Sequence, residues 1–155
     1  MTNFAFLPSQ FSAIAESATK AEGYIISDPR TACFHARFTL EAIVHWLYRF
    51  DNRLRQPYDN TLSALLHERS FQNLIPQALF YKAKLIKKIG NQAVHDRKDV
   101  AIQDAAQAVK ELHHFCYWLT RTYTPEAPRD GAAWKDDRIP HPSDPDAVVP
   151  RAELE

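Results

Sequence analysis

Lys82-Ala-Lys-Leu-Ile-Lys-Lys-Ile-Gly-Asn-Gln-Ala-Val-His-Asp96 combines an apolar seam with a cluster of basic side chains. The seam predicts an α-helix, because small and apolar residues recur at steps of three and four: Leu79, Ala83, Ile86, Gly90 and Ala93. A second set at four-residue spacing stacks along a different face of this helix. With its neighbours we call that set the basic ridge: Lys84, Lys87, Lys88, Asn91, His95 and Arg97. The ridge is either a solvated helix face, whose histidine caps the helix or satisfies a carbonyl near its end, or a contact surface for a ligand.

Gly90-Asn91-Gln-Ala-Val-His95 resembles the signature of the HEPN superfamily of small helical bundles. Nuclease members of that superfamily carry an arginine, a polar residue, three further residues and a histidine. Asn91 matches the polar position and His95 matches the histidine, whereas Gly90 occupies the arginine position. The chain therefore departs from the pattern at the point where the chemistry needs a cation.

Four segments in the same order resemble one HEPN-like family: Asn3-Phe-Ala-Phe-Leu7, Asp28-Pro-Arg-Thr-Ala-Cys-Phe-His-Ala-Arg37, Leu40-Glu-Ala-Ile-Val-His-Trp-Leu-Tyr48 and Ile89-Gly-Asn-Gln-Ala-Val-His95. That family is a domain of unknown function at the N-terminus of some type I restriction-enzyme R subunits and related helicases. The resemblance covers most of residues 1–123. It implies an ATP-dependent restriction endonuclease and DNA translocase as the parent protein, whose nuclease and translocase parts would follow residue 155.

The expected fold is all-α: a HEPN-like, up-and-down four-helix bundle with one or two short extra helices. Only 3 glycines occur in the chain, which favours helices over a sandwich or barrel with many tight turns. The last long helix extends to about Tyr123, and Pro76 places the start of the ridge helix at about Gln77. Residues that can cap the other predicted helices are Ser9, Asp28 followed by Pro29, one of Asp59, Asn60 or Thr61, and Asp99. A further short helical turn is expected to start at Ser70.

The chain changes character after Tyr123, so we expect two parts: a bundle over residues 1–123 and a Pro-rich acidic linker or arm over residues 124–155. Six of the 10 prolines lie in the second part. It carries four basic and eight acidic residues, a balance of −4, so with a net charge of zero the first part carries +4. Such a segment buries little apolar surface by itself. We expect it to be a linker or an extended arm that leads into a missing downstream region.

Several functional classes find no support in the sequence. No phosphate-binding glycine loop, nucleophilic-serine motif or dinucleotide fingerprint occurs, and we expect no cofactor. His113 and His114 are adjacent and point in different directions on a helix, so we expect no metal site. Cys33 and Cys116 lie in apolar helical patterns and predict buried free thiols. No apolar run reaches the length of a membrane span and no secretory signal is recognisable, so we expect a cytoplasmic protein that does not enter a membrane.

Two functions remain open. The first is a non-catalytic accessory domain whose basic ridge contacts DNA or RNA, or docks other restriction-modification subunits, downstream nuclease and helicase domains, or a second copy in a homodimer. The second is a metal-independent ribonuclease with His95 and Asn91 as the candidate catalytic residues, in which His95 transfers a proton and Lys87 or Lys88 has to supply the cation that Gly90 lacks. Arg37 and Glu41 are four residues apart and are expected to form a structural ion pair on one helix.

Overall fold

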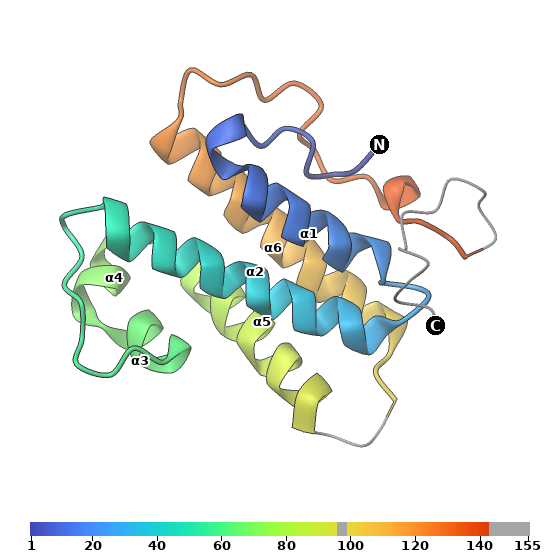
Figure 1. Cartoon of the computed structure of the whole chain (residues 1–155), viewed down its shortest axis with the longest axis horizontal. Coiled ribbons are helices and arrows are strands. Elements are labelled where there is room, and N and C mark those ends of the chain that lie inside the picture. The colour runs from blue at the N-terminus through green and yellow to red at the C-terminus, as the bar shows by residue number, and fades with distance from the viewer. Residues whose placement is uncertain (96–98, 143–155) are drawn as a thin grey trace.

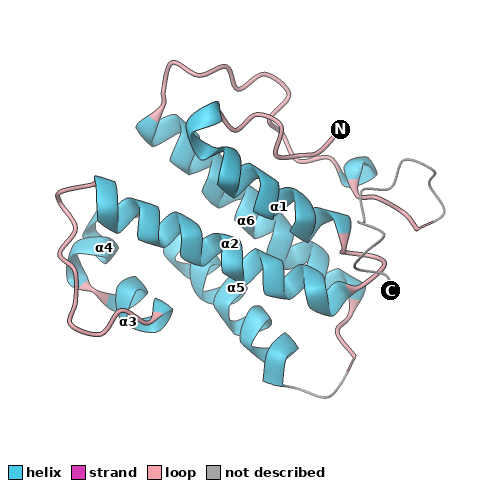
Figure 2. Cartoon of the chain, in the orientation of Figure 1, coloured by secondary structure: helices cyan, strands magenta, loops and turns pink. Residues whose placement is uncertain are grey.

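Helices are the regular elements of residues 1–95 and 99–142, which are the residues that the computed structural model describes (Figure 1 and Figure 2). The all-α prediction is confirmed, since no strand occurs in that part of the chain. Two 3-10 helices and six α-helices follow in the order η1 (Ser9–Phe11), α1 (Ser12–Gly23), α2 (Pro29–Phe50), α3 (Leu62–His67), α4 (Arg69–Leu74), α5 (Gln77–His95), α6 (Ile102–Tyr123) and η2 (Asp136–Arg138).

The four long helices pack together around α2, which contacts α1, α5 and α6. Successive long helices run in opposite directions, and α3 and α4 lie together at one end, beside the C-terminal end of α2 (Figure 1). The central position of α2 follows from its broad apolar stripe, all of which is buried: Ala32, Cys33, Ala36, Leu40, Ile43, Val44 and Leu47. Burial of such side chains is the main favourable term in folding, at about 25 cal/mol per Å².

Two predicted caps are present. The Asp28 carboxylate accepts a hydrogen bond from the Thr31 amide at 3.2 Å, with Pro29 as the first residue of α2. Thr61, one of three alternatives, accepts from the Ala64 amide at 3.2 Å at the start of α3. Each bond satisfies one of the amide groups that a helix leaves unpaired at its N-terminus.

The other two predicted caps, Ser9 and Asp99, are wrong. Ser9 opens η1 and not α1, and neither helix has a side-chain cap. The turn predicted to start at Ser70 is α4, which starts one residue earlier at Arg69, because Glu68 caps it by accepting from the Ser70 amide at 2.6 Å. The last helix begins only at Ile102, which leaves Asp99 too far upstream to reach its first amides.

The chain after Tyr123 folds back over the bundle as an arm, as far as residue 142 (Figure 1). Asn3 ties the arm to the N-terminal segment: its Oδ1 accepts from the Lys135 amide at 2.8 Å and its Nδ2 donates to the Lys135 carbonyl at 3.0 Å. Ile139 is buried against the core, and Trp134 packs partly buried on it. The arm therefore shares the core of the bundle over these residues and is not a free linker there.

His113 of α6 lies under this arm. It is 3% exposed, and the rings of Phe4, Phe6 and Trp134 surround it with centroids at 5.6, 5.3 and 5.5 Å. Neither ring nitrogen has a hydrogen-bond partner within the described residues. Burial lowers the pKa of His113 to about 4, so the side chain is neutral at pH 7.

Both cysteines are buried free thiols, as predicted. Burial raises the pKa of Cys33 to about 11 and raises that of Cys116 as well, so neither is a reactive thiolate. None of the helices in residues 1–95 and 99–142 combines the length and the apolar character needed to cross a bilayer.

Candidate functional site

The helix α5 presents the basic ridge because its other face is committed to the core. Its buried residues are the five that the seam predicts: Leu79, Ala83, Ile86, Gly90 and Ala93. The ridge residues consequently face outward: Lys84, Lys88 and His95 are exposed, whereas Lys87 and Asn91 are half-buried. Arg97, the last predicted member of the ridge, lies outside the described residues.

The structure brings most of the ridge together in one groove of about 500 Å³, whose lining includes Lys84, Lys87, Lys88 and Asn91. No ion pair joins these three lysines to a carboxylate anywhere in residues 1–95 and 99–142. The Lys84 ammonium lies 5.5 Å from the centre of the Phe80 ring, one turn earlier on α5. The ridge therefore keeps its positive charges available for an external anion.

Lys82 lies on the same helix but is not part of this surface. It points toward α6, where its Nζ forms an ion pair with Glu111 Oε2. The Glu111 side chain is only 8% exposed and also accepts from Gln107 Nε2 at 2.8 Å. Lys82 is thus neutralised by Glu111 within the fold, whereas the lysines of the basic ridge have no carboxylate partner in the described residues.

Gly90 lies where α5 packs closely against α2. A Cβ atom built on Gly90 would lie 2.6 Å from the Cβ and 2.8 Å from the Cδ of Arg37. Arg37 Cβ is attached directly to the α2 backbone and cannot move away alone. The arginine of the nuclease signature therefore has no room at position 90, and the nearest cation there is Arg37 from α2.

Arg37 is committed to Glu41, with Nη1 3.2 Å from Oε1. Both side chains are about one-third exposed, at 30% and 34%. At such exposure an ion pair stabilises the fold by only a few tenths of a kcal/mol, roughly 0.3–0.5. Its consequence is local: the Glu41 carboxylate offsets the charge of Arg37, the arginine that packs against Gly90.

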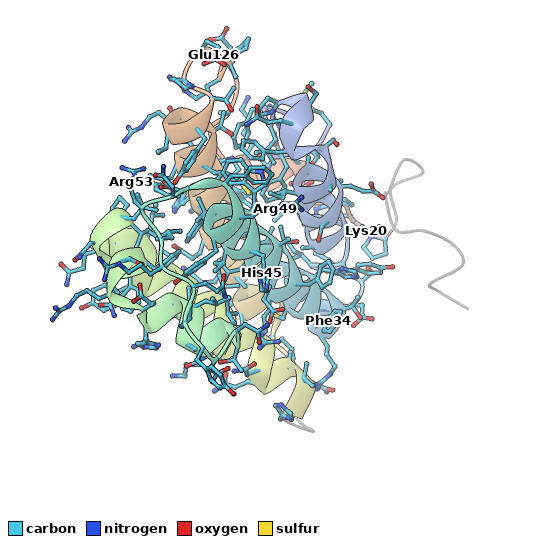
Figure 3. The ribbon with its side chains drawn as sticks, turned by 60° about the vertical axis from the view of Figure 1, so that its left-hand side comes forward. Lys20, Phe34, His45, Arg49, Arg53 and Glu126 are labelled. Atoms are coloured by element: carbon cyan, nitrogen blue, oxygen red, sulfur yellow. The ribbon has the colours of Figure 1, made fainter. Side chains whose placement is uncertain are left out.

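Two exposed aromatic residues near this crossing escaped the sequence analysis. Phe34 and Phe38 are 49% and 55% exposed and are four residues apart on α2. Phe34 lies one turn before Arg37, and it projects at the surface of α2 in Figure 3. The signal was available in the sequence Phe34-His-Ala-Arg-Phe38, because this pair falls outside the apolar stripe of α2.

The arrangement is suited to binding and poorly suited to acid–base chemistry. His95 is the last residue of α5 and is exposed to solvent. General acid–base catalysis on RNA also requires a cation placed to stabilise the phosphate in the transition state. Within the described residues, no three His, Cys, Asp or Glu side chains are grouped so that they could hold a metal ion.

Comparison with known proteins gives one match. A family model described as a domain of unknown function, DUF4145, matches residues 19–139. It thus includes α2, α5, α6 and the arm through Ile139. Neither the curated proteins nor the solved structures contain a match to the chain.

Proposed function

This chain belongs to the DUF4145 family, a family of domains of unknown function, and from its basic ridge we propose that it is a non-catalytic module that binds the phosphate backbone of nucleic acid. The observation that carries the proposal is that Lys84, Lys87 and Lys88 lack a carboxylate partner within the described residues. Unpaired lysines on one helix face form a local positive potential even in a chain with zero net charge.

The type of side chain suggests how such a contact works. A lysine ammonium is a compact point charge on a flexible stem, so it neutralises phosphates without reading base identity. Phe34 and Phe38 offer ring faces on which unstacked bases of a single strand can stack. We therefore expect weak binding that is insensitive to sequence, with single strands bound at least as well as duplexes.

The biological setting is part of the proposal. The motifs between Asn3 and His95 support a HEPN-like domain at the N-terminus of a type I restriction-enzyme R subunit or a related helicase. In that setting the module is cytoplasmic, needs no cofactor of its own, and adds a nucleic-acid contact to the downstream ATP-dependent nuclease and translocase. Docking to those downstream domains or to another restriction-modification subunit is the competing use of the same ridge.

The ribonuclease alternative is weakened at the position of the missing arginine. Gly90 supplies no cation, and Arg37, which lies against it, is paired with Glu41. Single-stranded RNA incubated with the purified protein should remain intact. Cleavage that disappears in His95→Ala would instead establish His95 as a proton-transfer group.

The binding proposal is tested by fluorescence anisotropy with labelled single-stranded DNA, single-stranded RNA and duplex DNA at low salt. The affinity should fall linearly with salt on a log–log plot, and each lysine that meets a phosphate should contribute about 0.7 to the slope for single strands. Lys87→Glu with Lys88→Glu should abolish binding. Lys110→Glu is the matched control, because Lys110 is an exposed lysine on α6.

No binding of the wild-type protein to any of the three nucleic acids would refute the proposal. If Lys87→Glu with Lys88→Glu then disrupts association with the rest of the parent protein, the ridge is a docking surface. The Lys110→Glu control separates that result from a general effect of lost positive charge.

A further inference from the structure

A second basic site lies where the loop after α2 meets α4. Arg53, Arg55 and Arg69 line one pocket of about 420 Å³, together with Glu68, Ser70 and Asn73. We propose that this pocket binds the terminal phosphate monoester of a nucleic-acid strand. The inference rests on the proposed function and names the feature of the nucleic acid that the protein recognises.

Arg53 is held in place by a buried carboxylate. Its Nε donates to Asp51 Oδ1 at 3.0 Å and its Nη2 donates to Asp51 Oδ2 at 2.7 Å. Asp51 is itself fixed, because it is buried and accepts from the Tyr123 hydroxyl at 2.6 Å. One edge of the guanidinium is thus anchored, and its remaining N–H groups are left for a ligand, since the Arg53 side chain is 64% exposed.

Arg55 and Arg69 complete the pocket from the two segments on its rim. The Arg55 amide donates to Ser70 Oγ at 2.9 Å, which ties the loop to α4 and sets the spacing between the two arginines. Neither guanidinium forms an ion pair with a carboxylate of the described residues. Both side chains are exposed to solvent.

The positive charge of the pocket favours a phosphate monoester over a phosphodiester. Three arginines stand against Glu68, whose carboxylate is engaged by the amide and hydroxyl of Ser70. With the Asp51 carboxylate that Arg53 binds, three positive and two negative charges leave +1. A phosphate monoester carries about −1.5 to −2 at pH 7, whereas an internal phosphodiester carries only −1. Guanidinium forks bind phosphate oxygens in pairs, which lysines cannot do.

The position of the pocket connects it with the basic ridge. The ring of His67, at the end of α3, meets the ring of Phe80 at 5.7 Å, and Lys84 lies over the same Phe80 ring. His67 directly precedes Glu68, Arg69 and Ser70 in the chain. A strand that follows the ridge toward the N-terminal end of α5 therefore approaches α3 and α4, where its end can enter the pocket.

The test compares single-stranded oligonucleotides of one sequence that end in a 5′-phosphate, a 3′-phosphate or hydroxyls only. At the same salt concentration, a phosphorylated end should bind the wild-type protein about tenfold more tightly than the hydroxyl form. Arg55→Gln with Arg69→Gln should remove this preference and leave the affinity for the hydroxyl form within about twofold. An advantage at one end or at both supports the inference and identifies the end that is bound.

Lys20→Gln with Lys110→Gln is the matched control, because it removes two positive charges from α1 and α6 and should preserve the preference. Lys87→Glu with Lys88→Glu should abolish the binding of all three oligonucleotides. Equal binding of the phosphorylated and hydroxyl forms, or a preference that survives Arg55→Gln with Arg69→Gln, overturns the inference while the proposed function stands. Absence of binding to all three overturns both.

Discussion

Arg37 of α2 and Gly90 of α5 are packed so closely that any side chain at position 90 would overlap the α2 helix, with a Cβ-to-Cβ distance of 2.6 Å. Van der Waals contact between carbon atoms is optimal at about 3.5–4.0 Å, so this separation cannot be kept without moving one helix. The glycine of the signature motif is therefore explained by helix packing.

The first prediction concerns this contact. Gly90→Ala should destabilise the protein, because the overpacking cost of about 1–3 kcal/mol exceeds the gain of up to about 1 kcal/mol from better helix propensity. Chemical denaturation measures the change, with Gln92→Ala, an exposed site on the same helix, as the control. Combining Gly90→Ala with Arg37→Gly, which removes the opposing Cβ, should cost less than the sum of the two single changes. A Gly90→Ala protein as stable as the wild type would refute this account.

The second prediction concerns His113 and acid. Its pKa is about 4 in the fold and 6.5 ordinarily, so the unfolded chain binds a proton that the folded protein does not. This difference does not change the free energy of unfolding above about pH 6.5. As the pH falls toward 4 it lowers the free energy of unfolding progressively, by roughly 3 kcal/mol at most. Burial is the main cause of the low pKa of His113, and nearby His114 and Arg138 lower this pKa further. The backbone near Ala132 and Asn3 raises it, without forming a hydrogen bond of ordinary geometry.

The pH dependence of the wild-type protein alone does not isolate His113, because burial raises the pKa of Glu22, which favours the fold in acid. Comparison with His113→Phe removes the contribution of Glu22, which both proteins share. The variant keeps an aromatic ring among Phe4, Phe6 and Trp134 and should be at least as stable as the wild type at pH 5. The difference in unfolding free energy between the two proteins should grow between pH 7 and pH 4. A constant difference over that range would show that His113 does not titrate as inferred.

The third prediction separates two lysines of α5. Lys82→Ala should reduce stability by about 1–3 kcal/mol, because it leaves the buried Glu111 carboxylate with Gln107 and the more distant His114. Lys84→Ala should change stability by less than about 0.5 kcal/mol, since Lys84 is exposed. Thermal unfolding at low salt measures both, and adding Glu111→Gln to Lys82→Ala should restore part of the loss. Equal effects of the two alanine variants would contradict the structural assignment.

The fourth prediction concerns the arm. Hydrogen exchange should be slow at the Lys135 amide, which donates to Asn3 Oδ1, and at the Ile139 amide, which donates to the Asp136 carbonyl. Asn3→Ala should accelerate exchange at both sites, because it also removes the donor to Glu22 and leaves that buried carboxylate with fewer partners. The amides of α2 should be unaffected. If Lys135 exchanges freely in the wild type, the arm is not docked in solution.

Local pattern was sufficient for much of the fold. The 3.6-residue period placed the long helices and the buried seam of α5, and Asp28 and Thr61 showed where two of the helices begin. Ser9 and Asp99 were misleading as caps, because capping depends on which residue precedes the first helical turn and several polar residues compete there. Glu68 was not predicted as the cap of α4, although its carboxylate reaches the Ser70 amide.

Contacts between distant segments were beyond such reasoning. The partners of Trp134 are Phe4 and His113, and nothing in the periodicity near residue 134 points to them. The close approach of Arg37 to Gly90 depends on how two helices cross. The arginine pocket gathers residues from a loop and a short helix whose distance in space the sequence does not reveal.

The contact between Trp134 and His113 also makes the protein its own optical reporter. Indole emission shifts to longer wavelength when the ring becomes exposed to water, and the Trp134 ring is partly buried, 5.5 Å from the neutral His113 ring, while the arm is docked. The other two tryptophans, Trp46 and Trp118, belong to α2 and α6 and pack against Tyr123, not against the arm residues around Trp134. Emission from a protein that retains Trp134 alone therefore reads the position of the arm directly, without an attached dye.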